Sequence, residues 1–375
     1  MIYLDYAADT PTSEDVLKNF YETTKKYPAN PNASHKLGKL AKEAINDSRT
    51  RVAELIGVRP EEVIYTSGAT EANNMAIKGI ANEYKNKGKH IITTYFEHAS
   101  VNAPILYLKE RGYEVDYVDI LPSGKVDIQN LKELIREDTI LVSVCMVDSE
   151  MGISQDISEI SEVLKNYPNA NFHIDATQAM GKTYVDCSNA DLITFSPHKF
   201  YGLQGVGVLV KKQGINLSPL LHGGQGDNFL RGGTPTTALI ISVEDSIKTA
   251  LDNVQDNFNT VKELNYILRD EINKISNIKI NSPEDASPYI LNISIKDVKA
   301  KNMQDKLSDK DIYISTKSAC TISANPSRSV MALYKDRKRA LATLRISLSP
   351  MTTKEEILKF TAEFKMLYEE LRQEK

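Results

Sequence analysis

The chain has 375 residues, of which 41% are hydrophobic and 26% carry a charge, as in ordinary globular proteins. That length exceeds the size at which a single hydrophobic core stops growing, so we expect at least two domains. The formal net charge of −4 at pH 7 argues against a protein that binds nucleic acid directly by electrostatic attraction.

Targeting and cysteine patterns predict a cytoplasmic protein. The N-terminal sequence, MIYLDYAADTP, has neither the basic region nor the long apolar region of a signal peptide. The longest nearly apolar run, TILVSVCMV, is too short to span a bilayer, so no membrane association is expected. The three cysteines, at positions 145, 187 and 320, form no CxxC pair, which disfavours a disulfide framework and a metal site.

The first clear element is an amphipathic helix over residues 35–57, which Gly57 ends. Short strand-like runs follow, and helical patterns separate most of them. Strands that alternate with helices predict a largely parallel sheet covered on both faces. In chain order, the seven runs are VIYT, HIITT, YEVDYVDI, TILVSVCMV, NFHID, DLITFS and GVGVLV.

The chain changes character near residue 250. Residues 243–276 read as one long, charged amphipathic helical stretch. The runs NIKINS, PYILNISI, IYIS and LRISLS then predict a smaller α+β unit that ends in a helix from Lys354 onward. The expected fold is α/β, with a mainly parallel seven-stranded sheet in a large domain (11–250) and a small domain formed by 251–375 together with 1–10.

One lysine stands where a ligand site is expected. Lys199 follows a predicted strand in the loop TFSPHKFYGLQG, among histidine, aromatic and glycine residues. A loop lysine is usually a solvated surface charge. At the ligand-facing edge of an α/β sheet, however, a lysine with such neighbours is suited to form a Schiff base with an aldehyde cofactor.

A carboxylate ends the buried strand in NFHIDATQAMGK. Asp175 there is either the N-cap of the following helix or the partner of a protonated pyridine nitrogen. Gln178 lies one helical turn further on. Asp175 followed by Lys199 after further strand and loop elements fits the chemistry of pyridoxal 5'-phosphate.

The segment VIYTSGATEANNMAIKG, residues 63–79, reads as a strand, a Ser-Gly-Ala-Thr turn and a helix. The backbone N–H groups at the helix start, with the hydroxyl of Thr70, form a natural phosphate cradle. A capped helix without a ligand is the alternative. Together with Asp175 and Lys199, the cradle supplies the phosphate end of the same cofactor.

Two further side chains suit a pyridoxal site. His98 follows the strand HIITTYFE at a helix start, where an imidazole can stack on a ring and move protons near neutral pH. Arg345 lies inside the apolar run of ATLRISLSP, and arginine binds a carboxylate bidentately. Taken alone, each is more often structural.

An ordered series of motifs resembles the cysteine desulfurases of the NifS/IscS type, which belong to the class V aminotransferase group of fold-type I pyridoxal enzymes. The resemblance runs nearly end to end. The motifs that carry it are IYLDYAADTP, NPNASH, TSGATEANN, GKHIITT, EHASV, DTILVS, HIDATQAMGK, FSPHKFYG, HGG, RGGTP, STKSAC and LRISLS.

The resemblance implies pyridoxal 5'-phosphate as cofactor and assigns residues to its ring. Lys199 would bind it covalently, Asp175 would pair with the pyridine nitrogen, and Gln178 would bond the phenolic oxygen. His98 would stack on the ring. Ser149 stands where the family usually has an asparagine near that phenolic oxygen.

The resemblance also assigns the phosphate and the oligomeric state. Thr70, Ser196 and His198 would bind the phosphate, with Ala69 beside them. Thr234 of RGGTP would reach across from the second subunit of a homodimer.

For the substrate, L-cysteine, the resemblance implies that Arg345 binds the carboxylate, with Asn32 of NPNASH also in the substrate site. Cys320, in the loop STKSACTISANPS, would be the nucleophile that takes the sulfur as a persulfide while L-alanine leaves. The sulfur would pass to an acceptor protein, either a tRNA-thiolating enzyme or an iron–sulfur scaffold.

Two alternatives to this function stay open at the level of sequence. One is a selenocysteine lyase or another pyridoxal-dependent C–S lyase. The other is a non-catalytic scaffold for sulfur-transfer partners, which the set of Lys199, Asp175, His98, Cys320 and Arg345 disfavours.

The sequence also departs from the family pattern at two positions. Lys317 stands where the family commonly has glycine, and Asn228 stands where it usually has a basic residue.

Overall fold

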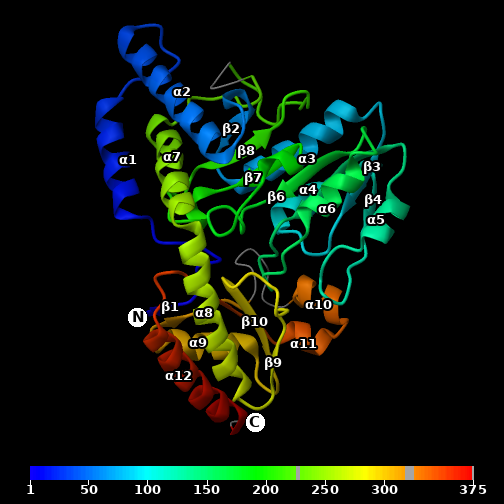
Figure 1. Cartoon of the computed structure of the whole chain (residues 1–375), viewed down its shortest axis with the longest axis vertical. Coiled ribbons are helices and arrows are strands. Elements are labelled where there is room, and N and C mark those ends of the chain that lie inside the picture. Colours follow the sequence, from blue (N-terminus) through cyan, green and yellow to red (C-terminus); the bar gives the residue numbers. More distant parts are fainter. Residues whose placement is uncertain (225–228, 317–324, 374–375) are drawn as a thin grey trace.

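The computed structural model describes residues 1–224, 229–316 and 325–373. Its central feature is a seven-stranded sheet with the order β2-β8-β7-β6-β5-β3-β4 (Figure 1). The strands are β2 (Val63–Thr66), β3 (His90–Thr93), β4 (Glu114–Tyr117), β5 (Thr139–Cys145), β6 (Asn171–Asp175), β7 (Leu192–Phe195) and β8 (Gly207–Lys211).

The sheet is mainly parallel, as predicted. Strands β4, β3, β5, β6 and β7 pair in parallel, and β8 runs antiparallel to both of its neighbours, β7 and β2. Each of the seven predicted runs overlaps one of these strands. Because helices cover both faces, most of the strands are buried on both sides, whereas the edge strand β4 is exposed or half-buried.

Two hydrophobic cores lie against the two faces of the sheet. One contains apolar side chains of helices α2, α5, α6 and α7, and the other those of α3 and α4. These helices are α2 (Lys36–Ile56), α3 (Ala69–Tyr84), α4 (Ala99–Lys109), α5 (Ile128–Leu134), α6 (Ile157–Leu164) and α7 (Thr237–Asp252); α1 (Glu14–Lys26) packs on α7.

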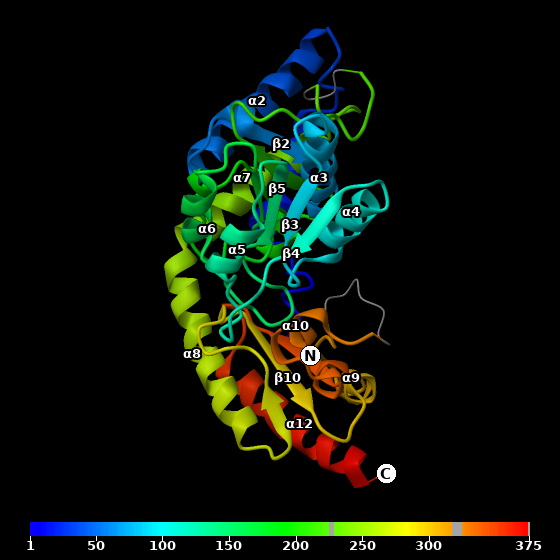
Figure 2. The same ribbon diagram turned by 90° about the vertical axis from the view of Figure 1, so that its right-hand side faces the viewer.

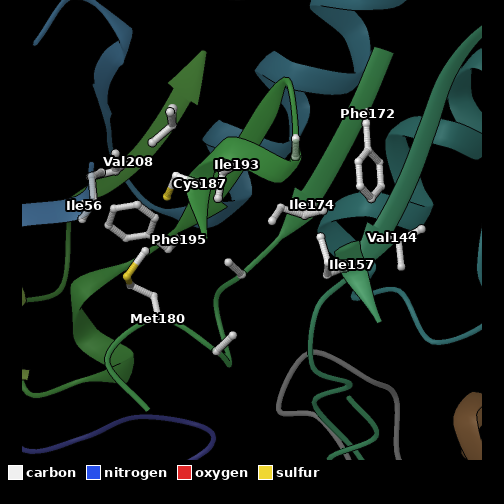
Figure 3. Close-up of a cluster of buried hydrophobic side chains, with 14 of the residues drawn as sticks. Ile56, Val144, Ile157, Phe172, Ile174, Met180, Cys187, Ile193, Phe195 and Val208 are labelled. Carbon is white, nitrogen blue, oxygen red and sulfur yellow. The ribbon is translucent and has the colours of Figure 1, made fainter. Parts of the chain in front are cut away.

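The strand side chains alternate between these cores. On β7, Ile193 and Phe195 face the core of α2 and α7, whereas Leu192 faces that of α3 and α4. Figure 3 shows Phe172, Ile174 and Phe195 projecting from neighbouring strands into the first core. This alternation fixes the register of the sheet and therefore which side chains emerge beyond the strand ends.

The predicted helical stretch over residues 243–276 is two helices. Helix α7 ends before Asn253, and α8 (Val254–Asn273) begins directly after it. Asn253 has φ −119° and ψ 7°, and its side chain donates a 3.0 Å hydrogen bond to the carbonyl of Thr249. Asparagine competes in this way with the helical backbone, which explains the break. In Figure 1 the two helices run from the upper part of the molecule to the lower part.

The lower part has its own core, built from residues of α8 and the strands and helices after it, together with Ile2, Leu4 and Ala7 (Figure 2). It contains the sheet β12-β10-β9 and the parallel pair β1-β11. The elements are β1 (Ile2–Tyr3), β9 (Ile278–Ile280), β10 (Ile290–Ile295), α9 (Ala300–Ser308), β11 (Ile312–Tyr313), α10 (Arg328–Tyr334), α11 (Arg337–Leu341), β12 (Thr343–Ser347) and α12 (Lys354–Gln373). Separate cores support a division near residue 251, which stays a prediction.

The smaller core is expected to depend on Phe360 of α12, which is fully buried. Phe360→Ala should lower the free energy of unfolding by about 3–5 kcal/mol, because it removes buried apolar surface and leaves a cavity. Leu358→Ala, on the same helix but 41% exposed, should change it by less than about 0.5 kcal/mol. Denaturant unfolding followed by circular dichroism tests this; equal effects of the two variants would show that Phe360 is not a core residue.

Candidate active site

A cavity of about 430 Å³ lies at the carboxyl ends of the parallel strands, the usual ligand edge of such sheets. Side chains from the large sheet, the N-terminal segment and β12 line it together. Of the predicted site residues, the cavity brings together Lys199, Asp175, Gln178, His98, Ala69, Thr70, His198, Ser149 and Arg345.

Asp175 is the most constrained of these side chains. It ends β6 and is 6% exposed. One carboxylate oxygen accepts from the N–H of Thr177 at 3.0 Å, and the other accepts from Nδ2 of Asn73 at 2.9 Å. The same Nδ2 lies 2.9 Å from the hydroxyl of Ser100. A buried carboxylate held in this way is fixed in direction and lacks a cationic hydrogen-bond partner among the described residues.

His98 extends this network from the start of α4. Its Nδ1 lies 2.8 Å from the Ser100 hydroxyl and accepts from the Ser100 N–H at 3.1 Å. Because Nδ1 accepts a backbone N–H, the ring hydrogen of the neutral imidazole belongs on Nε2. Burial lowers the pKa of His98, so the neutral form prevails at pH 7.

Lys199 is half-buried and is held by the N-terminal segment. Its Nζ donates to the carbonyl of Ala7 at 3.2 Å and also to that of Ala8. The loop after Lys199 is fixed to the same segment, because the N–H of Tyr201 donates to Thr10 Oγ1 at 2.7 Å. Tyr201 has φ 67°, a left-handed conformation that is uncommon outside glycine.

The predicted anion cradle corresponds to the start of α3. Gly68 occupies the N-cap position, and no side chain caps the helix there, which leaves backbone N–H groups for a ligand. The turn is packed closely on β8: a Cβ on Gly207 would lie 2.5 Å from the carbonyl carbon of Gly68. Glycine at 207 therefore permits the close approach that places Thr70 at the cavity.

Arg345 enters the cavity from β12 and is 1% exposed. Its Nη2 forms an ion pair with Asp5 at 2.8 Å, and Nη1 donates to the carbonyl of Ser149 at 3.0 Å. Its buried Nε has no hydrogen-bond partner within the described part of the chain. A guanidinium with an unused donor beside a cavity is suited to bind a carboxylate.

The cavity is electrostatically suited to an anion. Lys199 and Arg345 line it and Lys182 lies behind it, although the carboxylates of Asp9, Glu71 and Asp175 line it too. Burial, with the charge of Lys199 as the next cause, lowers the pKa of His198 to about 4, so this imidazole is neutral at pH 7. A ligand that carries phosphate or carboxylate groups would find fixed positive charges here.

Three of the predicted site residues that the structure describes do not line this cavity. Ser196 is fully buried, and its hydroxyl donates to the carbonyl of Val206 at 2.9 Å. Asn32 and Thr234 line a separate, open cavity near the start of α2. Cys320 lies outside the described residues, as do Lys317 and Asn228.

The two described cysteines are both buried. Cys145 ends β5, touches the cavity and has a pKa raised by burial well above that of a free thiol. Burial raises the pKa of Cys187 to about 11. Since the thiolate is the nucleophilic form, neither side chain is suited to attack a substrate near neutral pH.

Sequence reasoning missed several polar groups that hold the site. Asp5, the carbonyls of Ala7 and Ala8, and Asn73 all contact predicted site residues. Asp5, Ala7 and Ala8 belong to the motif IYLDYAADTP, and Asn73 belongs to TSGATEANN. These motifs carried the resemblance, but the contacts span up to 340 positions and no local pattern predicts them.

Comparison with known proteins identifies the family. The family model "Aminotransferase class-V" matches residues 2–360. The protein "Cysteine desulfurase IscS" of Buchnera aphidicola is 39% identical over 366 residues, covering 95% of this chain and 90% of the relative. Its namesake in Dictyoglomus turgidum is 37% identical, with 95% and 91% covered.

Solved structures agree in fold. A NifS-like protein superposes with a TM-score of 0.92 at 29% identity, covering 99% of this chain and 100% of the other. The structure described as SspA in complex with cysteine gives a TM-score of 0.81 at 32% identity, with 94% and 100% covered. The family and the fold expected from the motifs are confirmed, and the chain belongs to the aminotransferase class-V family, with cysteine desulfurases among its relatives.

Proposed function

We propose that this chain is a cysteine desulfurase, which uses pyridoxal 5'-phosphate to convert L-cysteine into L-alanine and to hand on the sulfur. The observation that carries the proposal is the convergence of Lys199, Asp175, His98 and Arg345 on one cavity, from segments far apart in the chain. Relatives named cysteine desulfurase, and a solved relative in complex with cysteine, support the reaction and the substrate.

The residues present fit this cofactor at both ends. The uncapped start of α3 and Thr70 suit a phosphate, and the buried carboxylate of Asp175 suits a protonated ring nitrogen. Thr177 Oγ1 and Asn73 Oδ1 are buried without a hydrogen-bond partner among the described residues. Unpaired buried polar atoms are unusual, so their presence beside Asp175 is consistent with a polar ligand that is bound there. When bound, the cofactor supplies an electron sink that weakens bonds at the substrate carbon atoms.

The chain's own side chains would bind and orient the substrate and the cofactor. Arg345 would bind the carboxylate of L-cysteine, for which its Nε is the free donor. Neutral His98, whose Nδ1 is held by Ser100, would donate a hydrogen bond from its Nε2–H toward the bound ligand. Lys199, kept at the cavity by the Ala7 and Ala8 carbonyls, would attach to the cofactor.

Cys320 is the proposed sulfur acceptor. Its thiolate would attack the substrate sulfur, so that an S–S bond forms as the C–S bond breaks, and L-alanine leaves once its β-carbon is protonated. The buried state of Cys145 and Cys187 supports this assignment, because it leaves Cys320 as the remaining thiol of the chain.

The partners follow from the same proposal. The persulfide sulfur would go to a tRNA-thiolating enzyme or to an iron–sulfur scaffold. Thr234 and Asn32, which share a second cavity, would serve the site of the other subunit in a homodimer. No described helix is long and apolar enough to cross a bilayer, and we propose a cytoplasmic location.

Replacing the proposed nucleophile tests the reaction. Cys320→Ala should lower sulfide release from L-cysteine by about a hundredfold or more, because it removes the nucleophile, while the pyridoxal absorbance is retained. Cys187→Ala, whose side chain lies in the core away from the cavity, should keep the activity. The assay measures alanine and sulfide with a reductant present. Unchanged sulfide release by Cys320→Ala would contradict the proposed role.

The pH dependence tests the role of His98. Its pKa is lowered below the ordinary value of 6.5, so the neutral imidazole is present above that pKa and is lost as the pH falls through it. The acid limb of kcat/KM that His98 contributes should therefore be centred below pH 6.5. Measured profiles of the wild type and His98→Gln test this. A limb centred above pH 6.5 that disappears in His98→Gln would contradict the assignment.

A further inference from the structure

A second buried lysine lies behind the active-site cavity. Lys182 follows Gln178 by four residues in the turn region after β6 and is 7% exposed. Its Nζ donates a 2.8 Å hydrogen bond to Oε1 of Gln178 and lies 5.8 Å from the ring centre of Tyr289. Within residues 1–224, 229–316 and 325–373, no carboxylate forms an ion pair with it. Burying such an amine is costly, and its one side-chain hydrogen bond points to a role at Gln178.

The hydrogen bonds of Gln178 set the direction of its amide. Its Oε1 accepts from Lys182, and its Nε2 donates to the carbonyl of Ala7 at 2.8 Å. The same carbonyl accepts from Nζ of Lys199. Turning the amide over would place its NH₂ group against the lysine donor and its oxygen against the Ala7 oxygen. Two neighbours therefore select one of the two amide orientations.

In this orientation Gln178 presents a hydrogen-bond donor, an N–H of its Nε2, to the cavity. Gln178 lines the cavity, and the second hydrogen of its Nε2 has no acceptor among the described residues. An N–H group directed at a ligand oxygen favours the ionised form of that oxygen. A reversed amide would offer a carbonyl oxygen instead and would repel it.

We propose that Lys182 is a positioning residue that locks the amide of Gln178 with its NH₂ group toward the cavity, where it donates to an anionic ring oxygen of the cofactor. The inference rests on the proposed function. It does not depend on the charge of Lys182, since both the ammonium and the neutral amine donate hydrogen bonds. Burial, together with Lys199 and Arg345, lowers the pKa of Lys182 to about 7.

A double-mutant cycle separates positioning from general damage. Lys182→Met keeps the length of the side chain and removes its donor, and Gln178→Ala removes the amide. The readouts are the dissociation constant of pyridoxal 5'-phosphate for the stripped enzyme and the pH at which the absorbance of the bound cofactor changes. Neither readout requires turnover.

Lys182→Met should weaken cofactor binding by about tenfold, the scale of one lost hydrogen bond. It should also raise the pH of the absorbance change, because the ionised oxygen loses a donor. In the Gln178→Ala background the same replacement should change the dissociation constant by less than about twofold. Lys182→Arg, which keeps donors, should bind the cofactor more tightly than Lys182→Met.

Lys211→Met is the matched control, because Lys211 is a partly buried lysine that donates to the carbonyl of Ile215 outside the cavity. It should leave both readouts unchanged. Thermal unfolding of the stripped proteins reports whether Lys182→Met folds; if it does not, Lys182→Arg and Gln178→Ala carry the comparison. Equal tenfold losses in both backgrounds, or wild-type binding by Lys182→Met, would overturn the inference alone. A wild type that binds no cofactor would overturn the proposed function as well.

Discussion

The buried carboxylate of Asp175 is the constraint around which the site is arranged. It ends a central strand of a sheet whose register is fixed by packing on both faces, so its place cannot shift without moving the core. Asn73 ties it to α3, and Ser100 ties the same amide to His98 at the start of α4. The carboxylate of Asp175, the proposed ring-stacking imidazole and the proposed phosphate cradle therefore share one rigid frame.

The N-terminal segment joins the two parts of the molecule at this site. Ile2 and Leu4 belong to the smaller core, whereas the carbonyls of Ala7 and Ala8 hold Lys199 of the larger sheet. Asp5, between them, pairs with Arg345. Residues 5–8 therefore hold both Lys199 and Arg345. The carbonyl oxygens and the carboxylate of this segment offset the repulsion between the two positive charges. The distance between Lys199 and Arg345, the two proposed ligand-binding cations, is therefore set by contacts to both hydrophobic cores.

Local patterns predicted the sheet. Residue patterns and the family resemblance together predicted nine of the residues that line the cavity, and strand ends of a parallel sheet meet at the edge where it lies. They did not predict contacts made by residues that look ordinary in sequence. Asp5 and Lys182 carry no pattern that singles them out in the sequence, yet both are fixed by partners in the folded chain. The prediction of one continuous helix across Asn253 was wrong for a similar reason. Hydrophobic periodicity continues through this position, and it carries no information about the side-chain hydrogen bond of Asn253 that breaks the helix.

Lys199 is the residue proposed to hold pyridoxal 5'-phosphate in this cavity. The most direct test is to reduce freshly purified protein with sodium borohydride, which fixes a cofactor bound as a Schiff base, and to locate the modified lysine by peptide mass spectrometry. If Lys199 binds the cofactor, a phosphopyridoxyl group is expected on Lys199, in the peptide that contains FSPHKFYG. Modification of Lys182 instead, or of no lysine in protein supplied with the cofactor, would contradict it.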